Sequence, residues 1–178
     1  MCGLAGLISL KKNHFDKKLF DALLKTRNLQ KHRGPDNFDW FQNTNIALFS
    51  NRLNIIDLTP NANMPMIDEK TGCIIVFNGE VYNYKELYSE LSEYNFKSKS
   101  DTEVILKSYI KWGSKCLSKF NGMFAFAIWD PRVNKLFCAR DRMGIKPFFY
   151  RKIKDHLLFS SEIKPLLLEN KKIPNEKV

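Results

Sequence analysis

The sequence predicts a layered fold in which two sheets are sandwiched between helices. Two observations lead to this prediction. Short segments rich in Ile, Val and Phe occur in groups, with amphipathic helical segments between them. Several of these strand-like segments are apolar on both faces, which is typical of strands buried on both sides. Periodicity does not choose the topology, so α/β and α+β architectures both stay open at this point.

In the first half of the chain, strands are expected at residues 2–10, 45–57 and 73–81, where apolar residues are dense. A helix is expected at 15–30, because its apolar residues recur near helical spacing. These residues are Phe15, Leu19, Leu23, Leu24 and Leu29. The helix should end before the Gly-Pro of "HRGPD" at 32–36, which favours a turn.

The second half begins with helices and continues with strands. Helices are expected at 83–94 and 101–113, and Asp101 stands where an N-cap would begin the second one. The expected strands are 123–130, 135–141, 147–153 and 156–161, followed by a short closing helix at 161–169.

Length and composition predict a single folded domain over residues 1–178. The chain has 178 residues, 44% of them hydrophobic and 14 of them Phe, which is enough for a packed core. We find no apolar run long enough to span a membrane and no signal peptide. A cytoplasmic location is therefore expected.

The cysteines and histidines are widely spaced. No two of them form a C-x-x-C pair or another spacing typical of zinc ligands, so neither a metal site nor a disulfide framework is expected. They are Cys2, Cys73, Cys116, Cys138, His14, His32 and His156.

The net charge of +10 raises the question of nucleic-acid binding. The lysines are spread along the whole chain, and there is no Arg-rich stripe or RNA-binding aromatic motif. A lysine-coated surface explains the charge better than a nucleic-acid interface. Part of this surface is a candidate to face a protein partner.

Cys2 has two interpretations. It is either a small buried side chain at the start of a core strand, or it becomes the first residue after Met1 is removed. In the second case it carries a thiol and a free α-amine. That amine titrates near pH 8, so it can accept the thiol proton without a histidine.

Polar residues at three further places stand where a strand-like segment ends or a helical segment begins. Asn78 and Gly79 can donate to an oxyanion, Arg52 matches a carboxylate, and Asp101 matches an ammonium group. An amino-acid amide such as glutamine would use all of them. Each residue also has a plain structural alternative: "NG" as a hairpin turn, Arg52 as a surface ion pair, and Asp101 as a helix cap.

Seven ordered motifs resemble the class II glutamine amidotransferase domain. They are "MCGLAG", "HRGPD", "NRLNIIDLT", "FNGEVYNY", "SDTEVIL", "FNGMFAFAIWD" and "ARDRMGIKPFFY". "HRGPD" together with "NGEVYNY" is most similar to the glutaminase domain of glutamine-hydrolysing asparagine synthetase. The resemblance extends from Met1 to about Leu168.

This resemblance implies an α+β fold of the N-terminal nucleophile hydrolase type, a four-layer αββα sandwich. It also implies that Met1 is removed, and that Cys2 attacks the glutamine side-chain amide to form a thioester. Gly3 agrees with that removal, since bulk there would hinder access. Asn78 and Gly79 match the oxyanion hole. The substrate-binding positions that match are Arg52, Leu53, Asn54, Ile55, Ile56, Asn78, Gly79, Glu80 and Asp101. "HRGPD" and "RDRMGIKPFFY" match only structural or domain-coupling elements.

The chain departs from asparagine synthetases in one large respect. Their second domain, with an "SGG-D-S" loop that activates aspartate with ATP, has no counterpart in residues 1–178. The expected partners are therefore L-glutamine and a synthetase domain or subunit that receives ammonia, with a homodimer possible. No cofactor is expected here, and ATP and Mg belong to the synthetase part. The alternatives are a non-catalytic docking or regulatory module of the same fold, or the glutaminase part of an amidotransferase that acts on a sugar or peptide.

Overall fold

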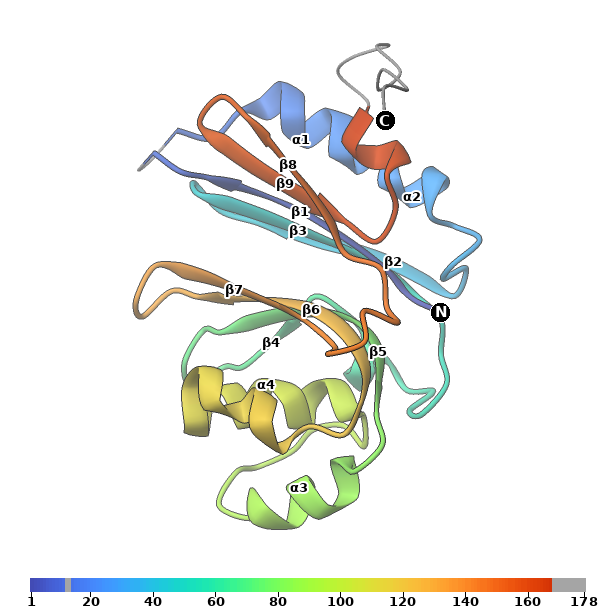
Figure 1. Cartoon of the computed structure of the whole chain (residues 1–178), viewed down its shortest axis with the longest axis vertical. Coiled ribbons are helices and arrows are strands. Elements are labelled where there is room, and N and C mark those ends of the chain that lie inside the picture. Colours follow the sequence, from blue (N-terminus) through green and yellow to red (C-terminus); the bar gives the residue numbers. More distant parts are fainter. Residues whose placement is uncertain (12–13, 168–178) are drawn as a thin grey trace.

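The computed structural model describes residues 1–11 and 14–167 as four stacked layers (Figure 1). Helices α1 (Lys17–Leu24) and α2 (Thr26–Leu29) cover one sheet. Helices α3 (Tyr84–Glu90) and α4 (Asp101–Trp112) cover the other. The two sheets face each other in the middle, which confirms the predicted α+β sandwich.

The first sheet has five strands in the order β2-β3-β1-β9-β8, and the second has four in the order β4-β5-β6-β7. All neighbouring strands are antiparallel. The first sheet comprises β1 (Gly3–Ser9), β2 (Asn37–Gln42), β3 (Ile46–Arg52), β8 (Phe149–Ile153) and β9 (His156–Ser160). The second comprises β4 (Met66–Ile67), β5 (Ile74–Val81), β6 (Gly122–Asp130) and β7 (Lys135–Arg140).

Three apolar clusters hold the four layers together. One contains side chains from both sheets, among them Leu4 of β1 and Val76 of β5. A second joins the first sheet to α1 and includes Ala5 and Leu23. The third joins the second sheet to α3 and α4 and includes Ile105 of α4.

Strand β1 contributes to two of these clusters. Leu4 belongs to the cluster between the sheets, and Ala5 belongs to the cluster beneath α1. Successive side chains of a strand point to opposite faces, so β1 is buried on both sides, as its composition predicts.

Four expected elements differ from the structure. The helix expected at 83–94 is shorter and ends at Glu90 as α3. The expected helix 15–30 is divided at Lys25 into α1 and α2. The expected strand 45–57 ends at Arg52, and residues 53–57 form a loop instead. The closing helix expected at 161–169 is a short 3-10 turn, Lys164–Leu167, because Pro165 lacks the N–H that a regular α-helix needs there. Residues 161–163 form a bend instead, and 168–169 lie outside the described residues.

Two strands were not expected from the sequence. Strand β2 is an edge strand whose apolar residues alternate with Asn, Asp and Gln, and its side chains are partly or fully exposed. Strand β4 has only two residues. Both lack the dense apolar pattern that identifies the central strands. The other short 3-10 helices are Pro60–Ala62 and Gly113–Lys119.

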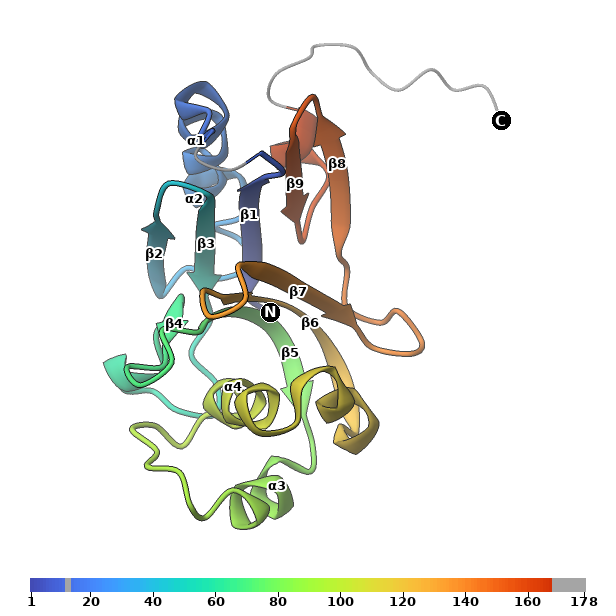
Figure 2. The same ribbon diagram turned by 90° about the vertical axis from the view of Figure 1, so that its left-hand side faces the viewer.

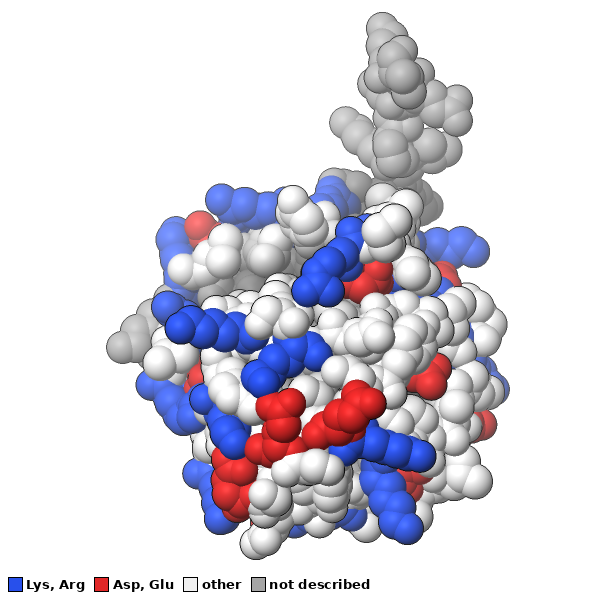
Figure 3. Space-filling model, turned by 60° about the horizontal axis from the view of Figure 1, so that its bottom comes forward, with Lys and Arg blue, Asp and Glu red and all other residues white. Residues whose placement is uncertain are grey.

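Charged side chains of both signs share the face drawn in Figure 3, where Lys and Arg lie among Asp and Glu and form no single band. In the part of the chain that the structure describes, no helix is long and apolar enough to cross a membrane.

Candidate active site

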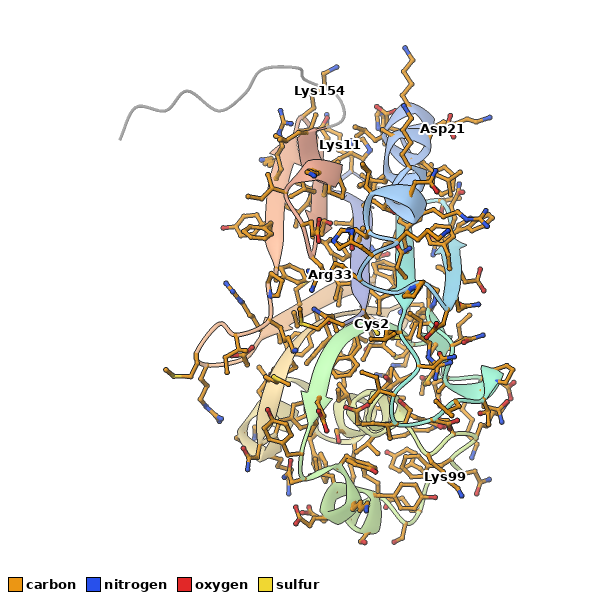
Figure 4. The ribbon with its side chains drawn as sticks, turned by 90° about the vertical axis from the view of Figure 1, so that its right-hand side faces the viewer. Cys2, Lys11, Asp21, Arg33, Lys99 and Lys154 are labelled. Carbon is orange, nitrogen blue, oxygen red and sulfur yellow. The ribbon has the colours of Figure 1, made fainter. Side chains whose placement is uncertain are left out.

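A pocket of about 160 Å³ opens where the start of β1 meets the second sheet. Cys2 lies in the middle of the molecule, between the two sheets (Figure 4), and the N-terminus is close to β5 in Figure 2. The side chains around the pocket come from the N-terminus, β3, β5, α4 and two loops. They include Cys2, Arg52, Leu53, Ile55, Ile56, Asp57, Asn78, Gly79, Glu80, Asp101 and Lys146.

The Cys2 thiol is half-buried at the wall of this pocket and also packs against the apolar cluster beneath the second sheet. Its Sγ accepts a hydrogen bond from Leu53 N at 3.4 Å and lies 3.7 Å from Leu53 O. Burial raises the pKa of the Cys2 thiol, although the Leu53 N–H, the N-terminal amine and Arg52 act in the opposite direction. The thiol is therefore protonated at neutral pH and needs a base before it can attack.

The "HRGPD" segment contacts the backbone of Cys2 and the backbone at the end of β3. Arg33 Nε donates to Cys2 O at 3.1 Å, and Arg33 lies next to Cys2 in Figure 4. Asp36 N donates to Arg52 O at 3.1 Å, and Asp36 Oδ2 accepts from Asn54 N at 2.8 Å. This segment therefore links β1 to the end of β3, which gives the motif a structural role.

Asn78 and Gly79 lie within β5, opposite Ala125 and Phe124 of β6, so the hairpin-turn alternative is wrong. Asn78 is fully buried, and its Nδ2 and Oδ1 have no hydrogen-bond partner within the described part of the chain. A buried amide without a partner is costly unless a ligand supplies one. Gly79 is required by close packing, since a Cβ there would lie 2.2 Å from Met123 O.

Arg52 is 4% exposed, so it is not a surface ion pair. Its Nη1 donates to Thr59 O at 3.1 Å and to Asn63 Oδ1 at 2.7 Å, and its Nη2 donates to Asp57 O. Burial lowers the pKa of the Arg52 guanidinium. The side chain therefore shapes the 53–63 loop from within and also lines the pocket.

Asp57 fastens the same loop to the segment before α4. Its Oδ2 accepts from Lys99 N at 2.8 Å, and its Oδ1 accepts from Thr59 N at 2.8 Å. The hydrogen bond from Lys99 N lowers the pKa of Asp57. The sequence analysis did not identify Asp57 as a site residue, because one Asp in a loop carries no distinctive signal.

Asp101 is the first residue of α4, and the N-cap is Ser100, whose side chain accepts from Thr102 N. The expectation that Asp101 caps the helix is therefore wrong. Asp101 is 3% exposed, and its Oδ2 accepts from Val81 N at 3.0 Å. Burial raises its pKa to about 6, and Glu80 adds to the rise.

Asp101→Asn should stabilise the protein at neutral pH. The pKa of Asp101 is about 6 when folded, above its ordinary value of 3.8, so stability falls as pH rises from about 4 to about 6 and stays reduced at higher pH. We expect a gain on the order of 2 kcal/mol at pH 8 that disappears near pH 4. Denaturant unfolding at both pH values measures it.

Asp57→Asn is the matched control, because the pKa of Asp57 is lowered by folding. Its ionised form adds stability that is present above its ordinary pKa and is lost as pH falls. The Asp57 variant should therefore be less stable at pH 8. An Asp101 variant that behaves like the Asp57 variant would contradict the assigned burial effect.

The structure brings most predicted site residues together around one pocket. Asn54 is the exception: its N–H bonds to Asp36, and the residue is not part of the pocket lining. Ile55 lines the rim and is 66% exposed. Lys146 was not predicted as a site residue, although it stands in the quoted "ARDRMGIKPFFY". Within residues 1–11 and 14–167, no group of three or more His, Cys, Asp or Glu could hold a metal ion.

Gly3 has a packing reason as well as the suggested link to Met1 removal. A Cβ at this position would lie 2.3 Å from Gln30 Oε1. Gln30 is buried, and its Nε2 donates to Ser160 Oγ at 2.6 Å. A larger residue at position 3 would therefore displace a buried side chain that joins the C-terminal end of α2 to β9.

The chain belongs to the glutamine amidotransferase domain family, which matches residues 1–177. Curated relatives include an asparagine synthetase [glutamine-hydrolyzing] of Bacillus subtilis, 41% identical over 93% of this chain. A putative asparagine synthetase of Methanocaldococcus jannaschii is 40% identical over 94% of this chain. The chain spans 22% and 35% of these two relatives.

Another relative has a different name. The "Amidase chry2" of Gibberella zeae is 37% identical over 94% of this chain, which spans 26% of that protein. Among solved structures, a glutamine phosphoribosylpyrophosphate amidotransferase from B. subtilis matches with a TM-score of 0.69 and 18% identity, over 94% of this chain and 43% of that one. This likeness supports the fold.

Proposed function

We propose that this domain hydrolyses L-glutamine to glutamate and ammonia, with Cys2 as the nucleophile. The observation that carries the proposal is the unpartnered, buried Asn78 amide in the same pocket as the Cys2 thiol. An amide that has no hydrogen-bond partner among the described residues is available to a developing oxyanion. Family membership and the names of the relatives support glutamine as the substrate.

The reaction begins with the loss of Met1, which frees the α-amine of Cys2. The amine accepts the thiol proton, and Sγ attacks the side-chain carbonyl carbon of glutamine. Asn78 Nδ2 and Gly79 N–H stabilise the negative oxygen of the tetrahedral intermediate. The amine returns its proton to the leaving nitrogen, ammonia departs, and a thioester forms. Water then attacks the thioester and releases glutamate and the thiol.

The charged residues of the pocket fit the two ends of an amino acid. In the proposal, Arg52 binds the α-carboxylate, and Glu80 and Asp101 receive the α-ammonium. Leu53, Ile55 and Ile56 form the wall that faces the substrate chain. The bound ammonium would stabilise the ionised form of Asp101, whose burial otherwise raises its pKa to about 6.

We propose that the ammonia passes to a synthetase domain or subunit of the asparagine synthetase type, in the cytoplasm. The names of several relatives support this acceptor, and the matched region is only part of each of them. The glutaminase step uses side chains and the α-amine, so no cofactor is proposed for it; ATP and Mg would act in the synthetase part.

The test is hydrolysis of L-glutamine by the purified protein, measured as glutamate formed. We expect turnover with L-glutamine and much less with L-asparagine. The side chain of asparagine is one methylene shorter, so its amide would not reach the Cys2 thiol when its α-carboxylate and α-ammonium are bound. Equal rates with both amides would contradict the proposed binding mode. No turnover by a protein that has lost Met1 would favour the non-catalytic docking or regulatory module.

A further inference from the structure

Lys146 is a buried lysine that the proposed reaction does not yet use. It is 5% exposed and lines the same pocket as Cys2 and Asn78. Its Nζ lies 3.4 Å from Met1 Sδ, and a thioether is a weak acceptor. Among the described residues, no carboxylate lies within ion-pair distance of this ammonium.

Among the described residues, the other strongly buried lysine has an ordinary explanation. Lys107 is 8% exposed, and its Nζ pairs with Asp68 Oδ2 at 2.5 Å. A buried ammonium normally has such a partner, because burial of an unpaired charge is costly. Lys146 therefore differs from Lys107 in a way that packing alone does not explain.

The backbone of Lys146 is fixed to the strand that faces the proposed oxyanion hole. Asp141 Oδ2 accepts from Lys146 N at 2.9 Å and from Phe124 N at 3.2 Å. Phe124 is the register partner of Gly79. Arg140 Nε donates to Lys146 O at 2.6 Å. The Lys146 side chain therefore starts from a rigid position beside the pocket.

We propose that Lys146 is a positioning residue whose ammonium keeps the α-amine of Cys2 unprotonated, so that this amine can serve as the base. This inference rests on the proposed function. Removal of Met1 takes away the thioether near Lys146 Nζ, and Cys2 and Lys146 line the same pocket of about 160 Å³. Two positive charges in one small pocket repel each other, so Lys146 opposes protonation of the amine.

Other charges around the pocket act on the same amine. Arg52 from β3 has the same effect as Lys146, and Arg33 is a further positive charge, whose Nε donates to the Cys2 carbonyl. The carboxylates of the pocket have the opposite effect and favour protonation of the amine. They are Asp57 in the loop after β3, Glu80 in β5 and Asp101 at the start of α4. Asp57 accepts from Lys99 N and Thr59 N, and Asp101 accepts from Val81 N, so each carboxylate already holds backbone donors.

The first experiment titrates the amine without any need for turnover. In a Cys2→Ser protein whose mass shows the loss of Met1, the ¹³Cα shift of Ser at this position reports the amine alone. We expect a pKa below the ordinary range of about 7.7–8.0, and a rise of about one unit on adding Lys146→Met. An amine pKa at or above that range in the protein with Lys146 intact would overturn the proposal.

The second experiment measures kcat/KM for glutamine against pH. Lys146→Met should move the acidic limb to higher pH by about one unit, which lowers activity on that limb roughly tenfold. Lys146→Arg keeps the positive charge, so its acidic limb should lie at the same pH as in the unchanged protein. Lys154→Met is the control, because Lys154 is exposed and lies far from Cys2 in Figure 4.

Two results would overturn the inference while the proposed function stands: a raised KM with an unmoved acidic limb, or a loss of thermal stability alone. If the Lys146→Met variants do not fold, the amine pKa of the Cys2→Ser protein with Lys146 intact still tests the inference. Retained Met1, or absence of glutamine hydrolysis, would instead count against the proposed function and this inference together.

Discussion

Cys2→Ala should abolish glutamine hydrolysis, with a loss of at least roughly 10⁴-fold in kcat. The variant keeps the α-amine and the pocket but has no atom that can form the thioester. Its fold should be unchanged, because the side chain is half-buried and its polar contacts are with Leu53 backbone groups. Glutamate formation and a thermal melt measure the two effects.

Cys138→Ala is the matched control, because Cys138 is an exposed cysteine on β7. It should retain full activity. Appreciable turnover by the Cys2 variant would contradict the nucleophile assignment. Loss of activity in both variants would point to a general effect on the protein rather than to Cys2.

Asn78→Ala should lower kcat by about 10²- to 10³-fold with little change in KM. The amide donates only to the oxyanion in the proposed reaction, so its removal affects the transition state more than glutamine binding. Since Asn78 Nδ2 and Oδ1 have no partner within the described residues, the variant loses no internal hydrogen bond of that side chain. Steady-state kinetics and denaturant unfolding test both statements.

Asn83→Ala provides the comparison. Asn83 Nδ2 donates to Lys119 O at 2.9 Å, and its Oδ1 accepts from Asn121 N at 3.0 Å. This variant should lose about 1–3 kcal/mol of stability and keep its kcat. If Asn78→Ala instead raised KM at constant kcat, the oxyanion role would be wrong.

The sequence predicted the central strands and most of the residues that line the pocket, because each has a strong local signal. The dense apolar runs of β5 and β6 are typical of buried strands, and the order of motifs identified Cys2, Arg52 and Asn78. Strand β2 was missed because an edge strand carries polar residues. The cap of α4 was misassigned by one residue, because Ser100 and Asp101 are both good caps and the choice depends on local geometry.

The electrostatic character of the site could not be predicted from the sequence. The burial that raises the pKa of Asp101 to about 6 comes from the packing of α4 against β5. Lys146 is far from Cys2 in sequence, and only the fold brings it to Met1. The pairing of Arg52 with the 53–63 loop likewise depends on the point at which β3 ends.

The most direct test of the central claim is the intact mass of the protein before and after incubation with a glutamine-analogue diazo-ketone norleucine. We predict that the protein has lost one methionine and gains a single adduct on Cys2, and that excess L-glutamine slows the reaction. A protein that retains Met1 and gains no adduct would contradict the account of Cys2 as an N-terminal nucleophile.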